Sequence, residues 1–155
     1  MSREYGQMEK KRTDPYQTGI IKENPYEKAK KREVRGKIVV VLDLKLDKRG
    51  YKLIPTPSRV VLSREIHELI STDEEKATPG QEVNRMAVIG FAEFTRGGVL
   101  AVGDKVTIGG REIGVVVGFD ETHAPNHLNI IILTTKRVSG FDLRVELEDD
   151  VTFSR

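Results

Sequence analysis

The chain has 155 residues, a formal net charge of +2, 37% hydrophobic residues and 32% charged residues. This length and composition are typical of one folded domain with its own core rather than of a disordered chain. The sequence contains no cysteine, which excludes disulfides, thiolate metal ligands and a cysteine nucleophile.

The sequence carries no hydrophobic signal for a membrane. No uninterrupted apolar run approaches the roughly 20 residues that a spanning helix needs. The first residues also lack the apolar core of a secretory signal peptide. We therefore expect a cytoplasmic protein that does not associate with membranes.

Positive charge is concentrated near the N-terminus. Residues 1–35 hold ten Lys and Arg against six Asp and Glu, whereas the remaining 120 residues hold 16 against 18. We expect a polar, basic N-terminal arm over residues 1–35 and a folded domain over residues 36–155. A nucleic-acid-binding domain usually carries its basic patch on the folded body, so nucleic acid is not favoured as a partner. The apolar and aromatic side chains of the arm suggest packing on a neighbouring subunit, and hence a homo-oligomer or a protein partner; they are Tyr16, Ile20, Ile21 and Tyr26.

The body opens with a strand signal. Residues 37–43 form a β-branched apolar run that predicts a buried strand, and the alternation over 44–47 predicts a half-exposed continuation. A turn at 48–51 followed by Lys52-Leu53-Ile54 suggests a hairpin.

Residues 59–70 carry the clearest helical spacing in the chain. Ser63 can cap such a helix, and Ile66, Leu69 and Ile70 recur at helical intervals. His67 would then be a partly exposed histidine beside the apolar stripe. The acidic segment 71–85 that follows is predicted to be a long loop, either a loose connection or a cover over a site.

The C-terminal half is predicted to be almost wholly β. Strands are expected at residues 86–94, 100–108, 113–118, 128–133 and 143–148, with a hairpin turn at Gly109-Gly110. Gly114 and Gly118 suggest bulges. The predicted fold is mainly β: a small, mostly antiparallel β-barrel with one short helix and an extended N-terminal arm.

The richest polar segment lies between two of these predicted strands. Two of the three histidines of the chain fall within residues 118–129. Their neighbours are nearly all hydrogen-bonding residues, which gives as candidate ligand- or partner-binding residues Asp120, Glu121, Thr122, His123, Asn126, His127 and Asn129. Pro125 disfavours helix at the preceding residue, so the two histidines need not share a helical face.

Four functions fit this segment. It could be a divalent metal site, for example for zinc, with His123, His127 and Asp120 as ligands. It could present a phosphoryl-accepting or general-base histidine, or a surface for a partner or small ligand. It could also be a loop closed by its own polar side chains.

Two resemblances accompany the C-terminal half. Residues 102–110 and 122–130 resemble an uncharacterised prokaryotic family with a domain of unknown function. More faintly, the same half is similar to the glucitol/sorbitol-specific IIA component of the sugar phosphotransferase system, with His127 matching a histidine before an apolar strand. That resemblance implies a small β-barrel and a phosphocarrier function. The phosphoacceptor position, however, aligns with residues 91–94, which contain no histidine.

We therefore predict a small binding or accessory protein, rather than an enzyme, with the loop 120–129 as its site. The alternatives are a small metal-dependent enzyme that uses His123 and His127, and a phosphocarrier like the IIA component.

Overall fold

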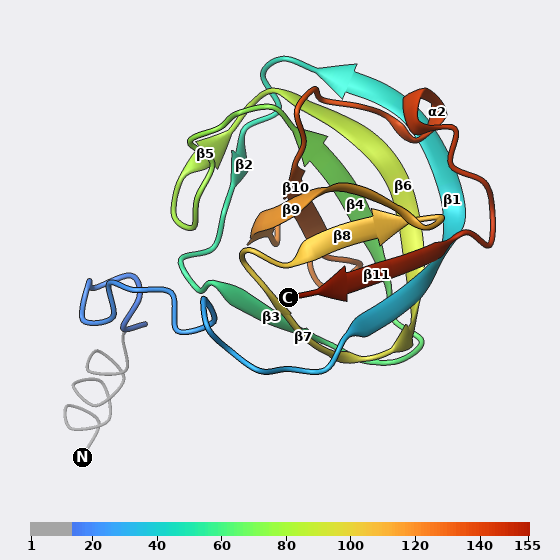
Figure 1. Ribbon diagram of the computed structural model, residues 1–155. Helices are drawn as coiled ribbons and strands as arrows, with labels where there is room; N and C mark the ends of the chain where they lie inside the picture. The colour runs from blue at the N-terminus through green and yellow to red at the C-terminus, as the bar shows by residue number, and fades with distance from the viewer. Residues whose placement is uncertain (1–13) are drawn as a thin grey trace.

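The computed structural model describes residues 14–155 and shows a mainly β protein (Figure 1). This confirms the predicted mainly β class; the described residues also contain one short helix, although not in the segment where the sequence predicts it. The strands are β1 (Val34–Leu46), β2 (Tyr51–Lys52), β3 (Ser58–Val61), β4 (Ile66–Thr72), β5 (Glu82–Val83), β6 (Met86–Arg96), β7 (Gly98–Ala101), β8 (Lys105–Ile108), β9 (Arg111–Asp120), β10 (Asn129–Leu133) and β11 (Asp150–Ser154), and the helix is α2 (Gly140–Leu143).

Seven strands pair in a ring. Their order is β1-β11-β8-β9-β10-β4-β6, and β6 returns to pair with β1, which closes the barrel. Every pair in the ring is antiparallel except β4 with β10. Two small sheets, β2 with β5 and β3 with β7, lie outside this ring.

Two cores lie on opposite faces of the same strands. The barrel interior contains Leu69, Phe119 and Ile130. A second core contains Ile70 and Ile131, together with Tyr51 from β2 and Val83 from β5. Because neighbouring residues in a strand point to opposite faces, β4 and β10 are buried on both sides where the β2–β5 sheet covers them.

The helix predicted at residues 59–70 is wrong, because this segment forms β3, a turn and β4. In β4 the side chains alternate: His67 and Leu69 are buried, and Glu68 is half-buried. Ile70 is buried on the other face, in the second core. Because β4 is covered on both faces here, its apolar residues recur at intervals that also fit a helix. Ser63 caps no helix; its hydroxyl donates to the Thr95 carbonyl.

Two further strand predictions are corrected. The hairpin over 48–54 is absent, because β2 pairs with β5 rather than returning to β1. The strand predicted at 143–148 is instead the end of α2 and a pair of turns. Arg144 and Glu148 have φ values of 56° and 72°, which belong to the left-handed region and not to a strand.

The predicted hairpin at Gly109-Gly110 joins β8 to β9 and is confirmed. The bulges are confirmed as well, since the pairing of β9 shifts next to Gly114 and next to Gly118. A Cβ at Gly114 would lie 2.1 Å from the Leu133 carbonyl oxygen. Only glycine permits this close approach of β9 to β10.

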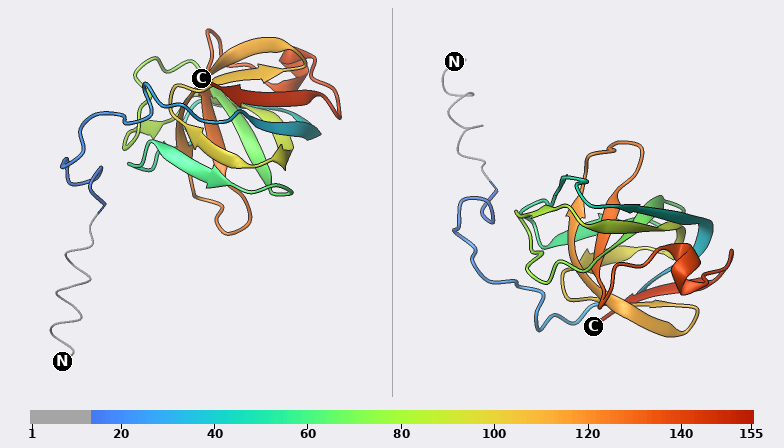
Figure 2. Two further views of the ribbon diagram at one scale, coloured as in Figure 1. Left: turned by 60° about the horizontal axis from the view of Figure 1, so that its bottom comes forward. Right: turned by 90° about the horizontal axis from the view of Figure 1, so that it is seen from above.

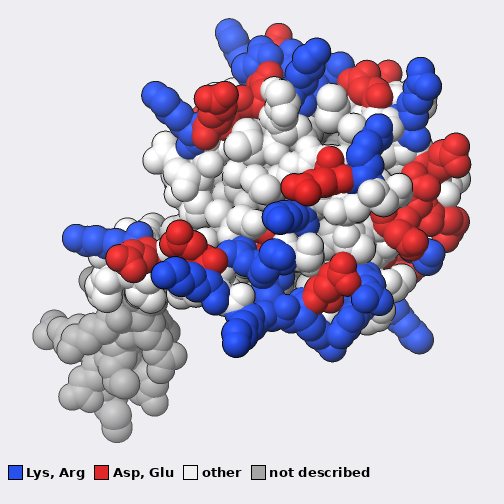
Figure 3. All heavy atoms as spheres, in the orientation of Figure 1, with Lys and Arg blue, Asp and Glu red and all other residues white. Residues whose placement is uncertain are grey.

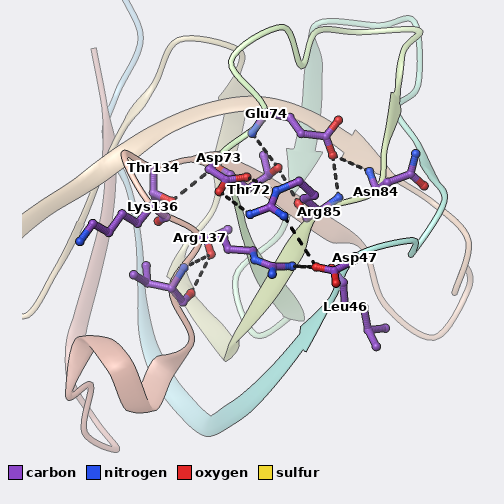
Figure 4. Close-up of polar contacts among 12 residues, drawn as sticks. Leu46, Asp47, Thr72, Asp73, Glu74, Asn84, Arg85, Thr134, Lys136 and Arg137 are labelled. Atoms are coloured by element: carbon purple, nitrogen blue, oxygen red, sulfur yellow. Dashed lines mark hydrogen bonds and ion pairs between the residues drawn. The ribbon is translucent and has the colours of Figure 1, made fainter.

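The segment 71–85 is an ordered excursion rather than a loose loop (Figure 4). The Glu74 carboxylate accepts the backbone N–H groups of Asn84 and Arg85 at 2.6 and 2.7 Å. Arg85 in turn donates two hydrogen bonds to Asp73, both at 3.0 Å. These contacts join the two ends of the segment, and the pairing of β5 with β2 places Val83 over the second core.

The described part of the arm lies against its own barrel. Asp104 is fully buried, and it pairs with Lys31 at 2.8 Å and with Arg155 at 3.1 Å. The Tyr26 hydroxyl accepts a hydrogen bond from Ser58. Lys and Arg side chains gather along the lower edge of the molecule in the view of Figure 3, where β1 begins and β3 and β7 lie. Residues 1–13 of the predicted arm lie outside the described residues.

Candidate functional site

The polar loop connects β9 to β10 and protrudes from one end of the barrel, as the orange loop in Figure 2. It consists of residues 121–128 and closes with backbone hydrogen bonds from Ala124 to Glu121 and from Asn126 to His123. Asp120 and Asn129 end the two flanking strands and lie opposite each other in the sheet. Both ends of the loop are therefore fixed by the barrel.

Asp120 stabilises the base of this loop. Its side chain is buried and accepts hydrogen bonds from the backbone N–H groups of Lys52 and Thr122, both at 2.9 Å, and from the Asn129 amide at 3.0 Å. Burial alone would raise the pKa of Asp120, but the hydrogen bonds from Thr122, Asn129 and Lys52 together lower it below its ordinary value. Asp120 is thus a satisfied carboxylate that ties the loop to β2 and β10.

The two loop histidines lie side by side. The rings of His123 and His127 stack, with centroids 5.0 Å apart and planes inclined by 29°. Arg49 contacts the His123 ring, since its guanidinium nitrogen lies 3.3 Å from His123 Nε2. An imidazole binds a metal in the plane of its ring, so two nearly parallel rings do not converge on one ion. Within residues 14–155 there is no group of three or more His, Cys, Asp or Glu side chains that could hold a metal ion.

His67, the third histidine, also lies at this end of the barrel. The residue is 95% buried, and its Nδ1 accepts the backbone N–H of Leu128 at 2.9 Å. A ring that accepts at Nδ1 carries its proton on Nε2 when neutral. Burial lowers the pKa of His67, and the facing carboxylate of Glu65 only partly opposes this shift. His67 is therefore a neutral hydrogen-bond donor at Nε2.

A pocket of about 180 Å³ lies beside His67, which is one of its lining residues. Its wall combines His67 and Glu65 from the β3–β4 region with the underside of the polar loop; the lining residues are Arg59, Glu65, Ile66, His67, Glu121, Ala124, Pro125, Asn126, His127 and Leu128. His67 Nε2 has no hydrogen-bond partner among the residues that the structure describes. The nearest carboxylate oxygen, Oε1 of Glu65, lies 3.5 Å away and already accepts the Leu62 N–H at 2.6 Å.

The mouth of the pocket carries opposite charges. Arg59 donates to the Glu121 carboxylate at 3.1 Å, and both side chains are partly exposed. The hydrogen bond from the Leu62 backbone lowers the pKa of Glu65 and keeps it ionised. A ligand here would meet donors from Arg59 and His67 and acceptors from the two glutamates.

The structure divides the predicted site residues into three groups. Glu121, Asn126 and His127 line the pocket. Asp120 and Asn129 are buried beside it and hold the loop, and Thr122 supplies a backbone donor to Asp120. His123 lies on Arg49 outside the pocket.

Sequence reasoning missed three polar residues that line the pocket, namely Arg59, Glu65 and His67. All of them lie in the segment that was predicted to be a helix. Read as a strand, this segment places His67 inside the barrel and Glu68 on the outer face, opposite Asn129. The parallel pairing of β4 with β10, which sets this arrangement, has no signal in the sequence.

The fold and this polar end define a small, mainly β domain with a candidate binding pocket. The chain belongs to a family of unknown function (DUF6917), whose model matches residues 28–154. This supports the resemblance to an uncharacterised family. No curated protein and no solved structure matches the chain, and the fainter similarity to the phosphotransferase IIA component therefore has no support from these comparisons. In the described part of the chain, no helix is long and apolar enough to cross a membrane.

Proposed function

We propose that the protein is a binding or accessory protein that holds a small polar ligand in the pocket beneath the loop 121–128. One observation carries the proposal: His67, which lines this pocket, has a buried Nε2–H without a hydrogen-bond partner among the described residues. A buried donor left unsatisfied costs about 1–3 kcal/mol, and an acceptor oxygen on a ligand would remove that cost. Ligand sites commonly combine such a fixed polar group with a preformed cavity.

The geometry constrains the ligand. Because His67 donates, the ligand carries an acceptor oxygen at that point, as a carbonyl, hydroxyl or carboxylate does. Since Glu65 is ionised and lies 3.5 Å from the same nitrogen, a second anionic group there would be repelled. An uncharged carbonyl or hydroxyl compound is thus favoured over a carboxylate. The volume of about 180 Å³ holds a small metabolite and not a macromolecule.

The proposal is tested by NMR titration of the isotope-labelled chain with a panel of small amides, polyols, sugars and carboxylates. Binding is expected to move the His67 ring signals and the Leu128 amide signal in a saturable way. The variant His67→Gln should weaken that binding at least tenfold, whereas His123→Gln, which changes a histidine outside the pocket, should leave it unchanged. The proposal fails if no panel member shifts these signals, or if His67→Gln binds as the wild type does.

A further inference from the structure

A second cluster of polar atoms lies on the outer face of the barrel, beyond the His127 ring, and does not depend on the pocket function. Glu68 of β4 and Asn129 of β10 are directly paired across the two parallel strands. His127 precedes Asn129 by two residues, and the edge of its ring lies against Phe91 of β6, which pairs with Glu68. Three polar side chains therefore meet at one place from two strands and the loop.

Each of these side chains carries an acceptor atom. The Asn129 amide nitrogen donates to Asp120, which leaves its Oδ1 facing away from Asp120. His127 Nδ1 lies 2.6 Å from the side-chain oxygen of Asn126, so Nδ1 carries the proton and Nε2 is the acceptor in the neutral ring. Glu68, when ionised, offers only acceptors.

These acceptors lack donors. His127 Nε2 and Asn129 Oδ1 are buried and have no hydrogen-bond partner anywhere in the chain from residue 14 onward. The Glu68 side chain is only 13% exposed, and its Oε1 lies 3.8 Å from His127 Nε2, beyond hydrogen-bonding distance. Buried acceptors without donors are costly, and a cation would relieve both of these atoms while also pairing with the Glu68 carboxylate.

We propose that Glu68, His127 and Asn129 form a divalent cation site, with water completing the coordination shell. One imidazole nitrogen, one carboxylate oxygen and one amide oxygen are a ligand set for a first-row transition ion such as Zn²⁺ or Mn²⁺. Two ligand atoms on one such ion, each about 2.0–2.2 Å from it, lie roughly 3 Å apart. The gap of 3.8 Å thus closes with a small rotation of the flexible Glu68 side chain.

This ligand set differs from the one predicted from sequence. Asp120 is already saturated by three donors, and His123 faces the cation of Arg49. Glu68 and Asn129 replace them. The third ligand is the amide oxygen of Asn129. This site therefore agrees with the absence, within residues 14–155, of a group of three or more His, Cys, Asp or Glu side chains.

The test is calorimetric titration of tag-free, metal-stripped protein with Zn²⁺, Mn²⁺ and Mg²⁺ in turn, together with the melting temperature in each ion. Binding of Zn²⁺ or Mn²⁺ at one ion per chain is expected, with a rise in melting temperature. Glu68→Gln and His127→Gln should each weaken binding at least ~10-fold, a loss in line with those seen at metal sites. His123→Gln is the matched control and should change the affinity by less than threefold.

Glu68→Gln also distinguishes a loss of ion binding from a loss of folding. It replaces a buried charge with a neutral group of the same shape, so the metal-free variant should fold and melt no lower than the wild type. Its melting temperature should then fail to rise with the ion. The proposal is overturned if no ion binds stoichiometrically, if binding is unchanged in both ligand variants, or if His127 proves to be doubly protonated at neutral pH in ¹⁵N spectra, since that proton would fill the cation's place.

Discussion

Replacing Asp120 by Asn is expected to destabilise the fold far more than a change of one atom suggests. The Oδ1 atom of Asp120 accepts from Thr122 and Asn129, and its Oδ2 atom accepts from the Lys52 N–H. An asparagine can present its oxygen to only one of these sides. Its NH₂ group then faces a donor on the other.

The magnitude follows from these three contacts. One buried donor loses its acceptor, which costs about 1–3 kcal/mol, and the two remaining hydrogen bonds lose the advantage of a charged acceptor, at roughly 0.5–1 kcal/mol each. We expect Asp120→Asn to lower the free energy of unfolding by about 2–5 kcal/mol. For a chain of this size that is a fall in melting temperature of roughly 4–20 °C.

Urea unfolding followed by circular dichroism measures this loss. Asp150→Asn serves as control, because Asp150 is exposed and pairs only with the exposed Lys37, a contact worth at most about 1 kcal/mol. A loss below 1 kcal/mol for Asp120→Asn, or one equal to that of Asp150→Asn, would refute the role of Asp120 as the anchor of the loop.

The same carboxylate predicts a pH dependence. Burial raises the pKa of Asp120 in the folded state, but its three donors lower it further, to below the ordinary value. The folded protein therefore binds this proton less readily than the unfolded chain does. The stabilisation from Asp120 is therefore complete above the ordinary aspartate pKa of about 4 and is lost as the pH falls through the lower, folded-state value. In Asp120→Asn this part of the acid-induced loss of stability should be missing from urea titrations between pH 5 and 2.

Two more predictions concern packing. Gly114→Ala would place a methyl group 2.1 Å from the Leu133 carbonyl, and we expect a loss of about 1–3 kcal/mol in urea unfolding; an unchanged midpoint would contradict the close approach of β9 and β10. Asp104→Asn leaves Lys31 and Arg155 without their shared buried anion, so we expect a loss of about 3 kcal/mol and faster cleavage by trypsin at Lys31. Equal cleavage rates would show that Asp104 does not hold the arm.

The β content and several strands were predictable because their signals are local. The β-branched runs of β1 and β10 and the glycine turn between β8 and β9 each carry a short-range pattern. The same holds for the bulges beside Gly114 and Gly118. These features depend on few residues beyond their own segment.

The β3–β4 segment was mispredicted because its pattern has a distant cause. Ile70 is apolar because Tyr51 and Val83 cover it from outside the barrel, and this covering is not visible from the spacing of residues 59–70. The candidate site was therefore predicted only in part. His67 and Glu68 reach the loop only through the parallel pairing of β4 with β10, whereas the loop residues themselves were recognisable from their polar composition.

The central claim is that His67 offers a free Nε2–H to a ligand in the pocket. Its most direct test is the ring ¹⁵N spectrum of His67, recorded from pH 8 to pH 5 without and with the panel compound that binds. We predict a neutral ring protonated on Nε2 at pH 8, because Nδ1 accepts from Leu128. Because burial lowers the pKa of His67, the ring should gain its second proton only below the ordinary histidine pKa, and the Nε2 signal should shift when the compound is added. A ring protonated on Nδ1, or an Nε2 signal that no compound moves, would contradict it.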